Sequence, residues 1–146
     1  MSTSTVASDV PATTVSQIFV NLHVKDLPAS MSFFKALGFS FNPDFTDENA
    51  ACMVMGPNLY SMLLTLPFFN GFAPKPASDT TKGCEVLVAL QLESREKVDD
   101  IVRRAVAAGG ATYNDPKDHG FMYQHGFTDL DGHVWEVFVM NGMPPQ

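Results

Sequence analysis

One order of predicted elements occurs twice along the chain, and this repeat limits the possible folds more than any other feature. In residues 17–24, "QIFVNLHV", aliphatic residues occupy every second position, as they do in a half-buried strand. A helical pattern over residues 26–38 follows, and three strand-like stretches then lead to residue 66. The same order returns between residues 84 and 140. Each half therefore reads β-α-β-β-β, which predicts an α+β protein of two such modules side by side.

The ends of both predicted helices carry capping residues. Asp26 and Ser94 are N-cap residues by type and position, and Gly38 and Gly109–Gly110 are suited to end the helices. The second helix has apolar residues at i, i+3, i+4, i+7 and i+8, namely Val98, Ile101, Val102, Ala105 and Val106. This spacing predicts that one face of the second helix packs on a sheet.

The stretch "FTDLDGHVWEVF", residues 127–138, reads as a hairpin with a tight turn at Asp131–Gly132. Its second strand contains one acid, Glu136, among apolar residues. A carboxylate in such a strand is costly unless a charged or hydrogen-bonding group meets it. Glu136 is therefore expected to face a metal, a ligand, or a buried partner such as His125 or Tyr123.

Composition and charge exclude several classes of partner. The chain has 146 residues, with 9 Lys+Arg against 16 Asp+Glu and a net charge of −7, which disfavours nucleic acid and anionic membranes. No apolar run is long enough to span a membrane, and the N-terminus lacks the pattern of a secretory signal. Two cysteines, Cys52 and Cys84, match no metal-site spacing. Two thiols in a chain of this size favour a reducing cytosol over a structural disulfide, so we expect a cytoplasmic protein.

The predicted division of the chain follows from this pattern. Residues 1–16 form an N-terminal tail, residues 17–66 and 84–141 form the modules, and residues 142–146 form a C-terminal tail. Residues 67–83, "PFFNGFAPKPASDTTKG", are expected to be a linker or a lid. The aromatic residues of this segment either fill a gap between the modules or form a flap over a ligand cavity.

Two stretches resemble a known superfamily. "VNLHVKDLPASMSFFKALGF" and "DLDGHVWEVF" are similar to the vicinal-oxygen-chelate superfamily, which includes glyoxalase I, bleomycin-resistance proteins and extradiol dioxygenases. Leu130 departs from its usual pattern, which has proline there. The resemblance covers residues 17–140 and implies two βαβββ modules that form a curved mixed sheet around a cavity. It also implies a homodimer and, in the metal enzymes, a divalent ion on the cavity floor.

The ligand positions that the resemblance implies hold few metal-binding residues. Phe19 stands at the implied metal-ligand position of the first strand, and Leu87 stands at the matching position of the second module. The last strand of the first module, "YSMLLTL", has no acid, histidine or amide, so only Glu136 remains. We therefore predict no cofactor. The alternative is a divalent metal held by a displaced set of His23, His125 and Glu136.

The faces opposite the helices are expected to line the cavity. We predict Glu136 as a catalytic residue and the following as ligand-binding residues: Phe19, Asn21, His23, Gln91, Tyr123, His125 and Phe138. This set is mostly aromatic with a few polar groups, which is typical of a small-molecule site. The predicted function is binding of a small apolar or aromatic molecule. The alternatives are a metal-dependent lyase, isomerase or dioxygenase, and a non-catalytic interaction module.

Overall fold

The computed structural model describes residues 11–142, so most of both predicted tails lies outside the described residues. The first module contains β1 (Ile18–Val24), α2 (Leu27–Ala36), β2 (Ser40–Asn42), the 3-10 helix η1 (Pro43–Phe45), β3 (Ala50–Gly56) and β4 (Leu59–Thr65). A short helix, α3 (Leu66–Phe72), follows. The second module contains β5 (Leu87–Gln91), α4 (Arg95–Ala107), β6 (Lys117–Asp118), β7 (Met122–Thr128) and β8 (Val134–Met140).

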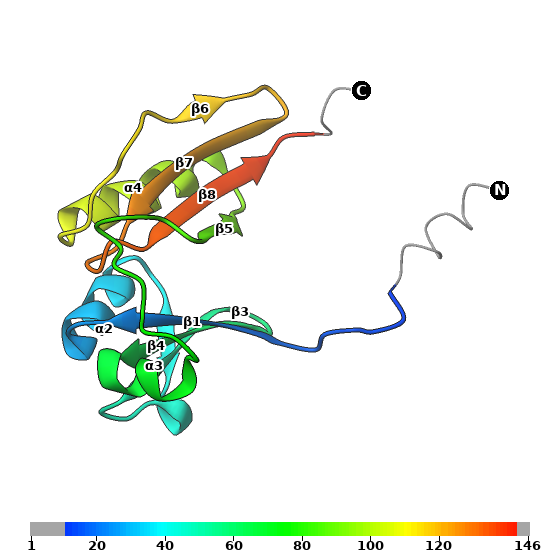
Figure 1. The fold of residues 1–146 in the computed structure, drawn as a ribbon. Helices are drawn as coiled ribbons and strands as arrows, with labels where there is room; N and C mark the ends of the chain where they lie inside the picture. The colour runs from blue at the N-terminus through cyan, green and yellow to red at the C-terminus, as the bar shows by residue number, and fades with distance from the viewer. Residues whose placement is uncertain (1–10, 143–146) are drawn as a thin grey trace.

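Each module builds one four-stranded mixed sheet (Figure 1). The strand orders are β1-β4-β3-β2 and β5-β8-β7-β6, so the two sheets have the same topology. In each sheet the first strand pairs in parallel with the last strand of its module, and the remaining pairs are antiparallel. The predicted α+β fold of two tandem βαβββ modules is confirmed.

The two long helices begin where the sequence predicts. The Asp26 carboxylate accepts a hydrogen bond from the Ala29 amide at 3.0 Å, and the Ser94 hydroxyl accepts one from the Lys97 amide at 3.2 Å. Gly38 follows α2 with a φ of +105°, a conformation that side chains disfavour. No helix within residues 11–142 is long and apolar enough to cross a membrane.

The helices join the modules through one hydrophobic core. On α2, Phe34 lies edge-on against Trp135 of β8 at 5.3 Å, and Phe33 lies 6.3 Å from Phe127 of β7. All four rings are buried. The first helix therefore contacts the second sheet as well as its own, and both modules contribute to a single buried cluster.

The segment after β4 does not run entirely as a loop. Residues 66–72 form α3, in which Phe68 and Phe72 are exposed while Phe69 is half-buried. The chain then crosses to β5, as the green path between the modules shows (Figure 1). Only part of the aromatic content of this segment therefore faces the interior of the molecule.

The hairpin between β7 and β8 differs from the predicted tight turn. Thr128 pairs with Val134, so the five residues from Asp129 to His133 form the loop. The Asp129 carboxylate shapes this loop, because it accepts hydrogen bonds from the amides of Asp131 and His133 at 2.9 and 3.0 Å. The predicted two-residue turn at Asp131–Gly132 is wrong, and the longer loop sets which strand residues lie opposite each other.

Candidate functional site

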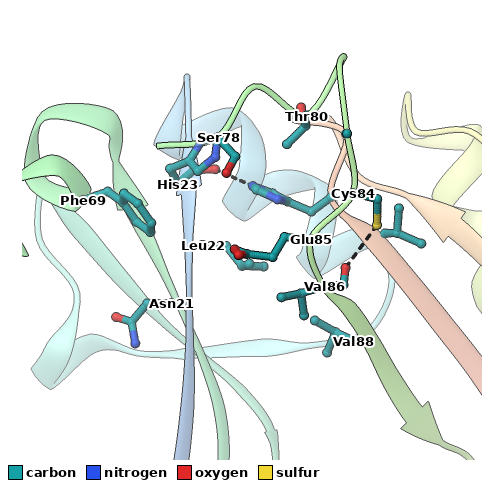
Figure 2. Close-up of a pocket in the computed structure, with 14 residues that line it drawn as sticks. Asn21, Leu22, His23, Phe69, Ser78, Thr80, Cys84, Glu85, Val86 and Val88 are labelled. Carbon is teal, nitrogen blue, oxygen red and sulfur yellow. Dashed lines mark hydrogen bonds between the residues drawn. The ribbon is translucent and has the colours of Figure 1, made fainter. Parts of the chain in front are cut away.

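A pocket lies where the two modules and the linker meet (Figure 2). Its volume is about 130 Å³. The lining comes from β1, α3, the crossing segment, the start of β5, the β7–β8 loop and the start of β8. It consists of Asn21, Leu22, His23, Phe69, Ser78, Thr80, Gly83, Cys84, Glu85, Val86, Val88, Gly132, His133 and Val134. Both modules therefore contribute to one site.

Two histidines form one wall of this pocket. The His133 Nε2 donates a hydrogen bond to the His23 carbonyl at 2.7 Å, and the two rings lie edge-on at 4.8 Å. Phe69 packs edge-on against the His23 ring at 5.2 Å. Burial lowers the pKa of His23, the neighbouring His133 ring lowers it further, and Asp131 acts in the opposite direction. His23 is therefore a neutral hydrogen-bonding group at pH 7.

The loop between β7 and β8 fixes this wall in place. Asp131 accepts hydrogen bonds from the Lys25 amide at 2.9 Å and from the Ser30 hydroxyl at 3.2 Å, which ties the loop to the start of α2. Its carbonyl accepts a bond from the Thr80 hydroxyl at 2.5 Å. The buried Asp129 accepts a bond from the Trp135 indole at 3.0 Å. The acids of "DLDGH" thus hold the two modules and the linker together.

Glu136 lies on the inner face of the second sheet, the face opposite α4. It pairs with Ala89 of β5 and with Gly126 of β7, and its side chain is half-buried. Val134 is two residues away on the same face and lines the pocket. The carboxylate therefore stands one side-chain position beyond the pocket edge.

The other residues predicted on inner faces have different surroundings. Asn21 and His23 line the pocket. Phe19 shares their face of β1 but stacks on Tyr60 with ring centres 4.8 Å apart. Phe138 lies on the Glu136 face, whereas Gln91 borders a separate, more open groove between the modules.

Tyr123 and His125 are not on the inner face, so their predicted place beside Glu136 is wrong. They pair with Val139 and Val137, whose side chains point into the core, whereas Glu136 points to the opposite face. The reason is the five-residue loop, because a one-residue change in register moves every side chain of a strand to the other face.

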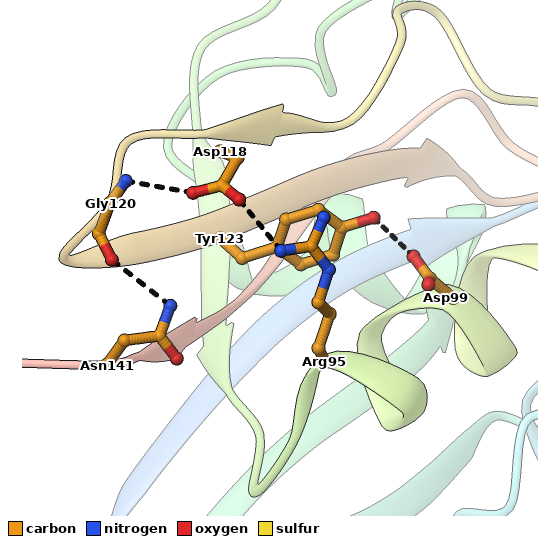
Figure 3. A network of polar contacts seen from close by, with 6 residues as sticks. All are labelled: Arg95, Asp99, Asp118, Gly120, Tyr123 and Asn141. Carbon is orange, nitrogen blue, oxygen red and sulfur yellow. Dashed lines mark hydrogen bonds and ion pairs between the residues drawn. The ribbon is translucent and has the colours of Figure 1, made fainter.

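Both side chains have structural partners instead. The Tyr123 hydroxyl donates to Asp99 of α4 at 2.5 Å, and the Arg95 guanidinium lies 3.9 Å above its ring while pairing with Asp118 at 2.8 Å (Figure 3). The hydrogen bond to Asp99 and burial raise the pKa of Tyr123. His125 Nε2 lies 2.8 Å from the Asn114 carbonyl. The network around Tyr123 braces α4 against its sheet.

Comparisons with known proteins agree with this geometry. Residues 17–56 match the family model described as bleomycin resistance protein-like N-terminal. A solved structure of a hypothetical protein from S. aureus is 31% identical, with a TM-score of 0.73, and the match covers 87% of this chain and 95% of that one. The chain belongs to the glyoxalase/bleomycin resistance/dioxygenase family.

More distantly similar solved structures share the fold. A family protein from Nocardioides is 23% identical with a TM-score of 0.69, and the match covers 99% of this chain and 96% of that one. The fosfomycin resistance protein FosX from Listeria monocytogenes is 18% identical with a TM-score of 0.63, over 87% and 94% of the two chains. No curated protein matches the chain.

The residues at the family's metal positions do not fit a divalent ion. Phe19 stacks on Tyr60, and the side chain of Leu87 offers no donor atom. The alternative set fails to converge, because His125 and Glu136 lie on opposite faces of the second sheet. Within residues 11–142, no group of three or more His, Cys, Asp or Glu side chains is arranged to hold a metal.

Several lining residues have no signal in the sequence pattern. Ser78, Thr80, Cys84 and Glu85 come from or just after the crossing segment, which has no periodicity from which an inward face can be read. His133 is found only through the loop that places it on His23. For Phe69, in contrast, the sequence offers a hint, because an aromatic residue is unusual in a solvated linker.

Proposed function

We propose that the protein binds a small, uncharged, apolar or aromatic molecule in the pocket between its modules. The lining carries this proposal. Apolar side chains from both modules and from α3, namely Leu22, Phe69, Val86, Val88 and Val134, surround a few short polar groups. Mostly apolar walls with a small number of convergent polar groups are the usual composition of a small-molecule site. The volume of about 130 Å³ limits the buried part of the ligand to a group of fragment size.

The charges at the site argue against an anionic ligand. Of the described residues that line the pocket, none is lysine or arginine, and Glu85 is an acid. His23 is neutral because burial lowers its pKa. The chain as a whole carries −7, which adds to the repulsion of anions. A neutral ligand avoids the cost of a buried charge without a partner.

Besides Glu85 in the pocket lining, Glu136 is a second carboxylate that a longer ligand would meet. It follows Val134 on the same face of β8, about 7 Å further along the strand. A ligand that extends past Val134 can therefore place a hydrogen-bond donor or an acidic proton against this carboxylate. We propose Glu136 as the hydrogen-bond acceptor of the site and as its candidate general base.

The binding proposal is tested with indole as a neutral aromatic probe. Ligand-observed NMR should detect indole binding to the wild-type protein, and Val86→Trp should abolish it because the larger side chain fills the pocket. Val106→Trp is the matched control, since Val106 on α4 is 46% exposed and Val86 is 52% exposed, but Val106 does not line the pocket. Equal binding to both variants, or no binding to the wild type, would contradict the proposal.

A charged probe tests the preference for a neutral ligand in the same experiment. Indole-3-carboxylate keeps the ring system and adds a negative charge, so it should bind more weakly than indole. Tighter binding of the carboxylate would show that the pocket prefers anions and would remove the argument from the missing cations.

We also propose that the protein is a homodimer, as family membership suggests. Ile18 and Leu59 are register partners at one end of the first sheet and are 51% and 48% exposed, and Leu87 on the second sheet is 56% exposed. The adjacent exposed side chains of Ile18 and Leu59 form an apolar surface that favours association. Sedimentation velocity at micromolar concentration should give a particle of twice the chain mass, and a monomer at that concentration would refute the dimer.

A further inference from the structure

The side chain of Tyr113 occupies the space above Gly126. A Cβ atom built on Gly126 would lie 2.1 Å from the Tyr113 hydroxyl oxygen and 2.7 Å from its ring carbon Cζ. Gly126 is not among the described glycines with positive φ, so its backbone does not require glycine. The missing side chain instead provides room for the phenol on the inner face of the second sheet.

This position brings the phenol next to Glu136. Gly126 and Glu136 are direct partners across β7 and β8, and directly opposed residues have Cβ positions about 4.5–5.5 Å apart. The Tyr113 hydroxyl therefore lies within side-chain reach of the Glu136 carboxylate, on the same face. No hydrogen bond to another group within residues 11–142 engages that hydroxyl, and Tyr113 is 47% exposed.

The pair is continuous with the pocket. Cys84 and Val134 both line the pocket, and Glu136 follows Val134 on the same face of β8. Burial, together with the charges of Glu136 and Cys84, raises the pKa of Tyr113. The phenol therefore keeps its proton at neutral pH and acts as a donor.

We propose that Tyr113 and Glu136 form a paired polar site at the pocket edge that binds a neutral carboxamide-type group. The inference rests on the proposed function, since the apolar part of the same ligand occupies the pocket. The phenol donates to the carbonyl oxygen of the ligand, and the carboxylate accepts from its N–H group.

The chemistry of the pair selects this class of group. An ionised carboxylate only accepts hydrogen bonds, while the phenol has a proton to donate, so the matching group must present a donor beside an acceptor. A ligand carboxylate meets Glu136 as a like charge. A hydrocarbon leaves both polar groups without a partner once water is displaced.

Benzamide and benzoate, which have nearly the same shape, provide the test. Amide NMR shifts of the protein, including that of Gly126, should follow benzamide binding, and benzoate should bind at least 10-fold more weakly. Tyr113→Phe should weaken benzamide binding about 3- to 10-fold, the usual effect of one lost hydrogen bond. Gly126→Ala should cause a similar loss, because its methyl group displaces the phenol.

The matched control is Tyr60→Phe, which removes a phenol hydroxyl from the other sheet and should leave benzamide binding unchanged. Unchanged benzamide binding in Tyr113→Phe, or equal binding of benzoate, overturns the paired site. The same holds if indole binds to the wild type and benzamide does not. Indole binding separates the two proposals, because it requires the pocket and not the phenol. If indole also fails to bind, the proposed function fails with the paired site.

Discussion

Replacing Gly110 with alanine should destabilise the fold strongly. A Cβ at this position would lie 2.4 Å from the Thr128 carbonyl oxygen, 3.0 Å from Cε1 of Phe33 and 3.1 Å from the Ala105 carbonyl oxygen. Two of these contacts are to backbone atoms, which cannot move away as a flexible side chain does. The segment must therefore shift and strain the Ala111–Thr128 bridge, whose two hydrogen bonds measure 3.2 and 2.8 Å.

The magnitude follows from these contacts. Overpacking of this kind costs about 1–3 kcal/mol, and each weakened hydrogen bond adds about 0.5–1.5 kcal/mol. Alanine also restricts the unfolded chain, which offsets about 0.4–1 kcal/mol. The free energy of unfolding of Gly110→Ala should therefore fall by about 2–4 kcal/mol. For a chain of this size, such a loss lowers the Tm by about 5–15 °C.

Urea unfolding measures this loss directly, as a shift of the midpoint at an unchanged slope. Gly71→Ala is the matched control. Apart from its sequence neighbours and the backbone of α3, no heavy atom of the described residues lies within 4 Å of a Cβ at Gly71. Gly71 lies within α3, so alanine there should be neutral or slightly stabilising. A Gly110→Ala variant within about 0.5 kcal/mol of wild type would refute the steric reasoning.

Three further measurements test other parts of the structure. The pKa of His23 is lower in the folded protein than in the unfolded chain. His23 therefore contributes stability above about pH 6.5, and this contribution is lost as the pH falls through the folded pKa. NMR titration of the ring should show the lowered pKa. Cys84 is exposed and should react with a thiol reagent in the folded protein, whereas the buried Cys52, whose pKa burial raises, should react only on unfolding. Phe34→Ala should cost about 3–5 kcal/mol in urea unfolding because it removes the contact with Trp135; a loss below about 1 kcal/mol would contradict the shared core.

The fold could be predicted because its signals are local and repeated. Asp26 and Ser94 cap the helices by contacts within four residues of themselves, and the buried face of α4 follows the spacing of Val98, Ile101 and Val102. Val106, although it continues this spacing, is 46% exposed because it lies near the end of the helix, at the edge of the packed face. These features depend little on the rest of the chain.

The site was less predictable because it depends on the length of one loop. A two-residue turn at Asp131–Gly132 places Phe127 opposite Glu136, and it brings His125 and Tyr123 to the same face. The observed loop places Gly126 there instead. The sequence "DLDGH" is compatible with both the two-residue turn and the five-residue loop. Asp129 selects the longer loop through its bonds to the loop amides and to the buried Trp135 indole, a long-range packing effect that local turn preferences omit.

Tyr113 shows the same limit from the other direction. Its stretch, "ATYN", forms no regular strand, and within it only Ala111 makes an isolated bridge, with Thr128. The residue gains its place from the absence of a side chain at Gly126, thirteen positions later in the chain. A glycine within a strand pattern signals a close approach of other atoms, yet it does not identify which residue approaches.

The contact of α2 with the second sheet determines how the molecule unfolds. Because Phe33 and Phe34 bury their rings against β7 and β8, cutting the chain in the crossing segment would leave a first half with two large aromatic rings in water. Internal duplication in such a protein does not yield two autonomous folding units. Heat should melt both halves in one transition, with equal calorimetric and van't Hoff enthalpies, and neither half should hold its structure when expressed alone.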